Sequence, residues 1–200
     1  MTASLDFRRD GRTEKVCAHD IEDYTEREHY WSIALRIDFN AHGMDCDVAD
    51  YGVDGSGTLI RGKLPNYNAD KKFTFADGKE MLIEVKTAPE GLEDFFTFKV
   101  FCLKKCVEQN ALVCVPQMRG YHLFEVPALK LLLDKKLFVH KIYRGFSPND
   151  PAVRIWTEED GRMDMQEMLA QKLVWFKRWS PEATQFNQNH KEILTRERQR

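Results

Sequence analysis

Three charged residues on a predicted β-hairpin have types and spacing that suit cation chemistry. Residues 66–87 read NYNADKKFTFADGKEMLIEVKT. Because side chains alternate faces along a strand, Ile83 and Val85 take one face while Glu84 and Lys86 share the other. A carboxylate and an ammonium group then stand side by side on a strand that is otherwise apolar.

The loop between the two strands decides whether Asp70 joins this pair. A three-residue loop over 76–78, with a left-handed glycine at its end, pairs Phe73 with Met81 and Asp70 with Glu84. A two-residue turn would put Asp70 on the opposite face. Because a one-residue slip would turn every apolar side chain outward, the hydrophobic pattern predicts the longer loop. Asp70 is therefore expected beside Glu84 and Lys86.

Two carboxylates beside a lysine predict a site for a hard cation. Oxygen ligands suit Mg²⁺, which keeps several waters and accepts phosphate oxygens as further ligands. Such an ion lowers the pKa of a bound water and stabilises the charge that develops on a phosphodiester. A lysine at this position can orient the attacking water or stabilise the transition state.

The order Asp70, a spacer of thirteen residues, then Glu84-Val85-Lys86 resembles the PD-(D/E)xK nuclease superfamily. The resemblance covers roughly residues 20–130, and Asn68-Ala69-Asp70 stands in place of the family's Pro-Asp. It implies a restriction-endonuclease-like core and Mg²⁺-dependent hydrolysis of DNA, with Mn²⁺ as a possible substitute. Asp70, Glu84 and the Val85 carbonyl would bind the metal, and Lys86 would position or activate water. The plainer alternative is a surface hairpin whose Glu-Lys pair is solvated.

A helix that precedes the hairpin offers a further carboxylate. It is predicted to begin at His19 or Asp20, and an apolar stripe at helical spacing runs through Ile21, Tyr24, Glu28, Trp31 and Leu35. The superfamily often supplies an additional metal-site glutamate from this helix, and Glu28 is the best match. Glu26, on a second face, is the alternative.

Composition indicates a single globular protein of the reducing cytosol. The 200 residues include five cysteines without a disulfide spacing, and no apolar run approaches the roughly 20 residues of a membrane span. The first residues lack a hydrophobic signal core, so a cytoplasmic location without membrane attachment is expected. Cys17, His19, His42 and Cys46 could together form a zinc site, a weaker hypothesis of a zinc-stabilised interaction protein.

The order of predicted elements is that of an α/β nuclease core. We expect a polar leader over 1–18, a core over 19–146 with a mixed central sheet flanked by helices, and a helical C-terminal extension over 147–200 packed on the core. The expected elements are a loop over 40–66 with a short strand at 58–60, the hairpin, a helix over 92–109, strands at 111–116 and 121–126, a helix over 128–136, an edge strand within 137–146, and helices at 163–179 and 182–200.

DNA is the expected partner, and Arg61, Lys63 and Lys99 are the candidate phosphate contacts near the site. A homodimer through the C-terminal helices is a further possibility, since those helices carry several aromatic residues. The alternative function is a catalytically inactive nuclease fold that binds DNA or protein. Sequence alone leaves open DNA versus RNA, endonuclease versus exonuclease, and the biological pathway.

Overall fold

The chain forms an α/β structure with a mixed six-stranded open sheet and, within its described residues, four helices. This computed structural model describes residues 14–51, 69–86, 95–117, 119–134, 138–139, 152–156 and 172–198. Side-chain positions are described for 26–51, 69–86, 98–117, 119–134 and 172–190. None of the helices in these ranges is long and apolar enough to cross a membrane.

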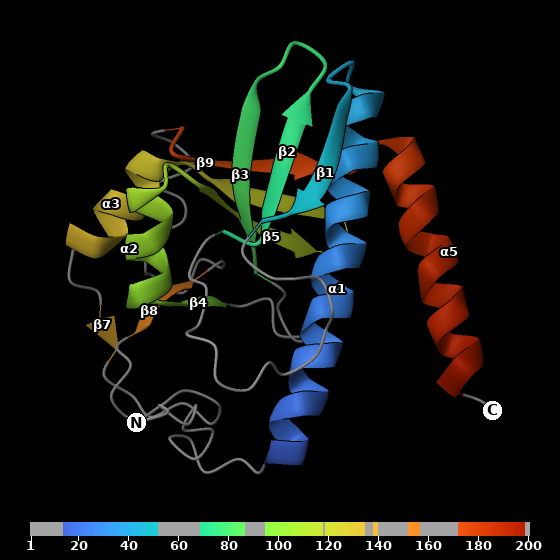
Figure 1. Ribbon diagram of the computed structural model, residues 1–200, viewed down its shortest axis with the longest axis horizontal. Coiled ribbons are helices and arrows are strands. Elements are labelled where there is room, and N and C mark those ends of the chain that lie inside the picture. Colours follow the sequence, from blue (N-terminus) through green and yellow to red (C-terminus); the bar gives the residue numbers. More distant parts are fainter. Residues whose placement is uncertain are drawn as a thin grey trace, which may run out of the picture.

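The main sheet has the strand order β1-β2-β3-β5-β6-β9 (Figure 1). Its strands are β1 (Cys46–Asp50), β2 (Lys71–Phe75), β3 (Glu80–Val85), β5 (Leu112–Gln117), β6 (Gly120–Phe124) and β9 (Val174–Arg178). The β3–β5 pair is parallel and every other neighbouring pair is antiparallel. Crossing from β3 to a parallel neighbour requires a long connection, and α2 lies in that connection.

Helices cover both faces of the sheet. α1 (Glu14–Ala41) and α5 (Pro181–Arg198) lie on one side, and α2 (Val100–Glu108) and α3 (Val126–Asp134) on the other (Figure 1). On the first side Leu35 of α1 packs with Phe73 and Ile83, and on the second Leu103 and Leu129 belong to a separate apolar cluster. Because both faces are covered, the central strand β5 is apolar and buried along most of its length, as predicted.

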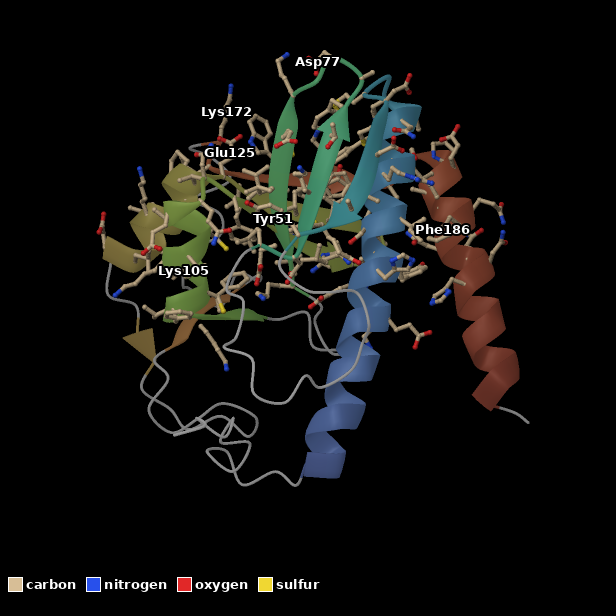
Figure 2. The ribbon with its side chains drawn as sticks, viewed as in Figure 1. Tyr51, Asp77, Lys105, Glu125, Lys172 and Phe186 are labelled. Carbon is tan, nitrogen blue, oxygen red and sulfur yellow. The ribbon has the colours of Figure 1, made fainter. Side chains whose placement is uncertain are left out.

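α5 packs on α1 through aromatic side chains. The ring of Tyr30 stacks on Phe186 and His190, with centroid distances of 5.2 and 3.9 Å. Figure 2 shows Phe186 between the two helices. The aromatic residues of this described part of α5 are thus used within the chain, and a homodimer contact through the C-terminal helices stays a prediction.

The hairpin of β2 and β3 has the predicted loop and register. Phe73 pairs with Met81, and Phe75 N–H donates to Lys79 O at 2.9 Å, which closes a loop over 76–78. Gly78 has a φ of 81°, the left-handed conformation that a glycine adopts without steric cost. The hydrophobic pattern therefore outweighed the commoner two-residue turn.

Several other predicted elements were wrong, and the missed strands share a cause. α1 begins at Glu14, inside the predicted polar leader, and β1 occupies part of the predicted loop. The predicted helix over 92–109 begins as strand β4 (Phe95–Lys99), and the end of the predicted helix over 163–179 is β9. Each missed strand is stabilised by a partner strand distant in sequence, and no local pattern reveals that partner.

A second, smaller antiparallel sheet contains β4, β8 (Ala152–Trp156) and β7 (Phe138–Val139), in the order β4-β8-β7. β7 falls within the predicted edge strand at 137–146. β4 runs directly into α2, so this sheet fixes the start of the helix that borders the candidate site. The short strand predicted at 58–60 lies outside the described residues, and the predicted domain limits stay predictions.

Candidate metal and phosphate site

Asp70, Glu84 and Lys86 meet at the end of the β2–β3 hairpin remote from its turn. Extending the register of the hairpin by one pair places Asp70 opposite Glu84, and Lys86 directly follows β3. Tyr51 N–H donates to Asp70 O at 3.0 Å, and Figure 2 shows Tyr51 at the opposite end of these strands from Asp77. The three predicted residues are therefore brought together.

Both carboxylates are buried and both are hydrogen-bonded. Asp70 is 8% exposed and Glu84 is 7% exposed. Asp70 Oδ2 accepts a hydrogen bond from Val85 N–H at 2.8 Å, and the Lys86 ammonium donates to Glu84 Oε1. The Lys86 side chain keeps about a third of its surface exposed (32%), so the ion pair is open to solvent on the lysine side.

The carboxylates of the site repel one another and are attracted to Lys86. Burial raises the pKa of Asp70 well above its ordinary value, and repulsion from Glu84 and Glu28 adds to this, while attraction to Lys86 opposes it. Burial alone would lower the pKa of Lys86, but the carboxylates of Glu84 and Asp70 reverse that effect and raise it. The lysine therefore stays an ammonium ion.

Glu28 approaches the same charges from α1. Burial raises the pKa of Glu28 from 4.5 to about 7. Attraction to Lys86 lowers this pKa and repulsion from Glu84 raises it, but burial is the largest effect. Glu26, the alternative on the same helix, is exposed. Of the two glutamates, Glu28 is the one that interacts electrostatically with the hairpin residues.

A second ion pair borders Glu28, and the sequence reading missed it. Lys71 is buried, and its ammonium donates to the Asp50 carboxylate across the β1–β2 pair. Lys71 has the same strand parity as Phe73, so a cation stands where the alternation requires an apolar side chain. This break in the alternation at Lys71 was the feature of the sequence that could have revealed the buried cation. No such feature pointed to Asp50, because strand β1 itself was not predicted.

α2 borders the site from the face of the sheet opposite to α1. Ala69 N–H, next to Asp70, donates to Gln109 Oε1 at 2.9 Å. Burial raises the pKa of the Cys102 thiol on α2, and the positive charges of Lys86 and Lys99 oppose that shift. The predicted phosphate contact Lys99 therefore lies close enough to this border of the site to interact with Cys102. Arg61 and Lys63, the other two predicted contacts, lie outside the described residues.

The residue types of the site suit a divalent cation, but the positions of the side chains do not form a ready set of ligands. Buried carboxylates with raised pKa values are groups that a nearby cation would stabilise. Among the side chains that the structure describes, however, no three Asp, Glu, His or Cys residues form a group that could hold a metal ion. Glu84 Oε1 accepts from the Lys86 ammonium and Asp70 Oδ2 accepts from Val85 N–H, so one oxygen of each carboxylate is already engaged.

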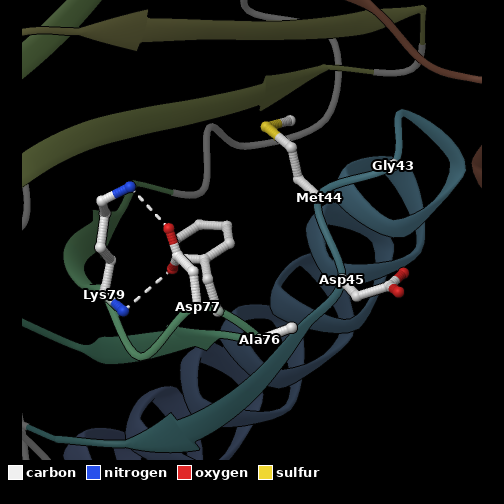
Figure 3. Close-up of a pocket in the computed structure, with 7 residues that line it drawn as sticks. Gly43, Met44, Asp45, Ala76, Asp77 and Lys79 are labelled. Atoms are coloured by element: carbon white, nitrogen blue, oxygen red, sulfur yellow. Dashed lines mark hydrogen bonds and ion pairs between the residues drawn. The ribbon is translucent and has the colours of Figure 1, made fainter.

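A hollow of about 420 Å³ lies at the turn end of the hairpin, away from these charges (Figure 3). Lys79 there bonds to Asp77, with Nζ 2.6 Å from Oδ2, and both side chains are largely exposed. It offers no buried polar group, so we place the candidate site at the other end of the strands. The lining residues are Gly43, Met44, Asp45, Phe75, Ala76, Asp77 and Lys79.

The zinc hypothesis gains no support from the residues that can be placed. His42 Nδ1 lies 2.7 Å from the Asp38 carbonyl oxygen, and Cys46 is buried with Phe73 in the core beneath α1. The side chains of Cys17 and His19 lie outside the described part. Searches of protein-family models and of curated proteins found no match to this chain.

Proposed function

We propose that this protein is a Mg²⁺-dependent nuclease of the PD-(D/E)xK type that hydrolyses DNA phosphodiester bonds. The observation that carries the proposal is the convergence of Asp70, Glu84 and Lys86 at one end of a hairpin, with Glu28 beside them. A mixed sheet with helices on both faces is compatible with a restriction-endonuclease-like core, and that finer description of the fold is part of the proposal.

Four groups would hold the cation in this proposal. They are the carboxylates of Asp70, Glu84 and Glu28 and the backbone carbonyl of Val85. When bound, Mg²⁺ would lower the pKa of an attacking water and stabilise charge on the phosphate. Deprotonated carboxylates are required for this, so cation binding and the proton on Glu28 are linked.

Lys86 acts as a donor in this scheme. Its raised pKa keeps the ammonium protonated, so it cannot accept the water's proton at neutral pH. Released from Glu84, the ammonium orients the attacking water or donates to a phosphate oxygen as negative charge develops. The ion pair with Glu84 keeps this group at the site before the cation binds.

The test is a cleavage assay on labelled linear duplex, single-stranded, nicked, flapped and four-way-junction DNA. Wild type in Mg²⁺ or Mn²⁺ should cut at least one substrate, and EDTA should stop the reaction. Lys86→Ala should lower the cleavage rate by about 10²–10⁴-fold. Lys79→Ala, at the other end of β3, is the matched control and should cut like wild type.

A folded wild type that cuts no substrate with either metal would remove the enzyme proposal. The second candidate, an inactive nuclease fold that binds DNA, would then be preferred. It is favoured by the closed Glu84–Lys86 pair and by the lack of a ready metal-ligand group among the described side chains. Equal traces of cutting from wild type and Lys86→Ala would indicate a contaminating nuclease.

A further inference from the structure

The edge strand β9 presents unusual side chains to solvent. After the buried Val174, all four residues of the strand are exposed: Trp175, Phe176, Lys177 and Arg178. Phe176 is 43% exposed and Trp175 is 40% exposed. Two large aromatic residues and two cations lie on a strand that, among the described strands, forms an edge of the sheet, and such edges invite association with another molecule.

Phe176 shares a face and a cross-strand row with the candidate site. The β3–β5 register, extended by one residue, places Lys86 beside Val115, which pairs with His122, which in turn pairs with Phe176. Val115 and His122 are buried, so only the two ends of this row, Lys86 and Phe176, reach solvent. Three strand spacings separate Lys86 from Phe176, about 14 Å. Because one strand of duplex DNA carries a phosphate every 3.4 Å or so, this span corresponds to a few nucleotides.

The two aromatic side chains of β9 point to opposite faces and have different surroundings. The Phe176 ring lies against His122 at a centroid distance of 4.9 Å, and the residue is 43% exposed. Trp175 Nε1–H donates to Glu125 Oε1 at 2.8 Å, so an acidic group accompanies that ring. Among the described side chains, a carboxylate is bonded to the Trp175 ring and none is bonded beside the Phe176 ring.

Positive charge gathers around this row. Arg178 shares the Phe176 face by strand parity and pairs with Gly120, which has no side chain to cover it. Arg119 and Lys172 are exposed on the turns next to β9, whereas Lys177 is exposed on the opposite face of the strand, with Trp175. Within the described residues no ion pair is found for any of these cations. Exposed cations beside an exposed ring match a nucleic-acid strand, whose phosphates are anionic and whose bases stack.

We propose that the Phe176 face of β9 binds the unpaired strand of a nucleic acid whose scissile phosphate lies at Lys86. A base stacks on Phe176 and an adjacent phosphate contacts Arg178. A single strand fits better than a duplex, because the faces of paired bases are already covered by their neighbours. This inference rests on the proposed nuclease function and specifies its substrate as DNA with a single-stranded flank.

The test measures binding in EDTA, where cleavage is prevented, by fluorescence anisotropy of a labelled oligothymidylate of about 20 nucleotides. Phe176→Ala and Phe176→Leu should weaken binding by about tenfold, whereas Phe176→Tyr, which keeps the ring, should not. Trp175→Ala, on the same strand but the opposite face, is the matched control and should bind like wild type. Arg178→Gln should reduce the slope of log K against log salt by about 0.7.

The leucine and tyrosine variants carry the test if Phe176→Ala does not fold. Absence of oligonucleotide binding by wild type overturns the proposal, and so does equal binding by Phe176→Leu and Phe176→Tyr. Equal weakening by Trp175→Ala would also overturn it, because the effect would not belong to one face. The cleavage assay separates the two claims: a wild type that cuts, with Phe176 variants that bind normally, retains the nuclease and loses only this surface.

Discussion

At the residue scale, the candidate site concentrates more acid than its lysine can neutralise. Asp70 and Glu84 are buried, Glu28 of α1 interacts electrostatically with both, and Lys86 attracts all three carboxylates. Such an arrangement costs stability unless a further cation or a proton compensates it. Buried groups with strongly shifted pKa values beside a specific charge partner are typical of functional sites.

Glu28 makes stability depend on pH in a defined direction. Its folded-state pKa of about 7 exceeds the ordinary 4.5, so the folded chain binds more protons than the unfolded chain between these values. Stability therefore falls as pH rises from about 4.5 to 7, by about 2 kcal/mol once partial exposure is allowed for. Urea unfolding in EDTA at pH 5 and pH 8 should show Glu28→Gln gaining that amount relative to wild type at the higher pH.

Glu26→Gln is the control for this experiment, because Glu26 is exposed on the same helix. Its stability relative to wild type should not change between the two pH values. A Glu28→Gln variant that tracks wild type at both pH values would show that Glu28 is not buried beside the hairpin carboxylates.

At the element scale, two glycines are required for different reasons. Gly78 ends the hairpin loop with a φ of 81° and has open space around it, with no atom within 4 Å of a built Cβ. At Gly120 a Cβ would lie 2.1 Å from the Lys177 backbone oxygen. Gly78 is needed for its left-handed backbone conformation, whereas Gly120 is needed because a side chain there would prevent β9 from approaching β6.

Alanine at these two positions should therefore have unequal effects. Gly78→Ala should lower the free energy of unfolding by about 1 kcal/mol, the usual conformational penalty. Gly120→Ala should cost more, about 2–4 kcal/mol, because backbone must move and β9 must separate from β6. Denaturant unfolding gives both values, and hydrogen exchange should show lost protection of β9 amides in Gly120→Ala alone. Equal costs would mean that β9 does not pack at the observed distance.

At the scale of the whole molecule, the buried carboxylate of Asp38 joins three distant segments. It accepts a hydrogen bond from Tyr121 O–H at 2.8 Å and from Ser180 N–H at 2.7 Å, linking α1 to β6 and to the start of α5. Burial and the bond to Asp38 raise the pKa of Tyr121, so the phenol remains a donor. Ser180 also caps α5, because its Oγ accepts from Ala183 N–H at 3.2 Å.

Asp38→Ala should leave both donors buried without an acceptor. The expected loss is about 3 kcal/mol of unfolding free energy, with α5 becoming the least protected helix in hydrogen exchange. Tyr121→Phe, which removes one donor together with its bond, should cost about 1 kcal/mol. If Asp38→Ala costs no more than Tyr121→Phe, the bond to Ser180 contributes nothing to the docking of α5.

Cation binding should stabilise the entire fold if the proposed site is correct. A ligand at a hundred times its dissociation constant adds about 2.7 kcal/mol, or several degrees in Tm for a chain of this size. Thermal unfolding should therefore shift upward with Mg²⁺ for wild type and not for Asp70→Asn. NaCl at equal ionic strength controls for screening, and an equal shift in the variant would place the Mg²⁺ effect elsewhere on the chain.

The sequence by itself determined the hairpin and the meeting of its charges. Alternation along β2 and β3 fixed the loop, the register and the common face of Asp70, Glu84 and Lys86, because a slip by one residue would expose every apolar side chain. Helical spacing likewise located Glu28 on α1 and most of α5. Each of these patterns is local, and only one arrangement of the segment buries all of its apolar side chains.

Only the tertiary structure decided the remaining strands and the second layer of the site. β1, β4 and β9 exist because distant strands pair with them, and stretches such as Val174–Arg178 fit a helix or a strand equally well until that partner is present. The Asp50–Lys71 pair and the cross-strand row that ends at the exposed Phe176 follow from those pairings. Charge compensation and exposure depend on neighbours in space, which local spacing does not encode.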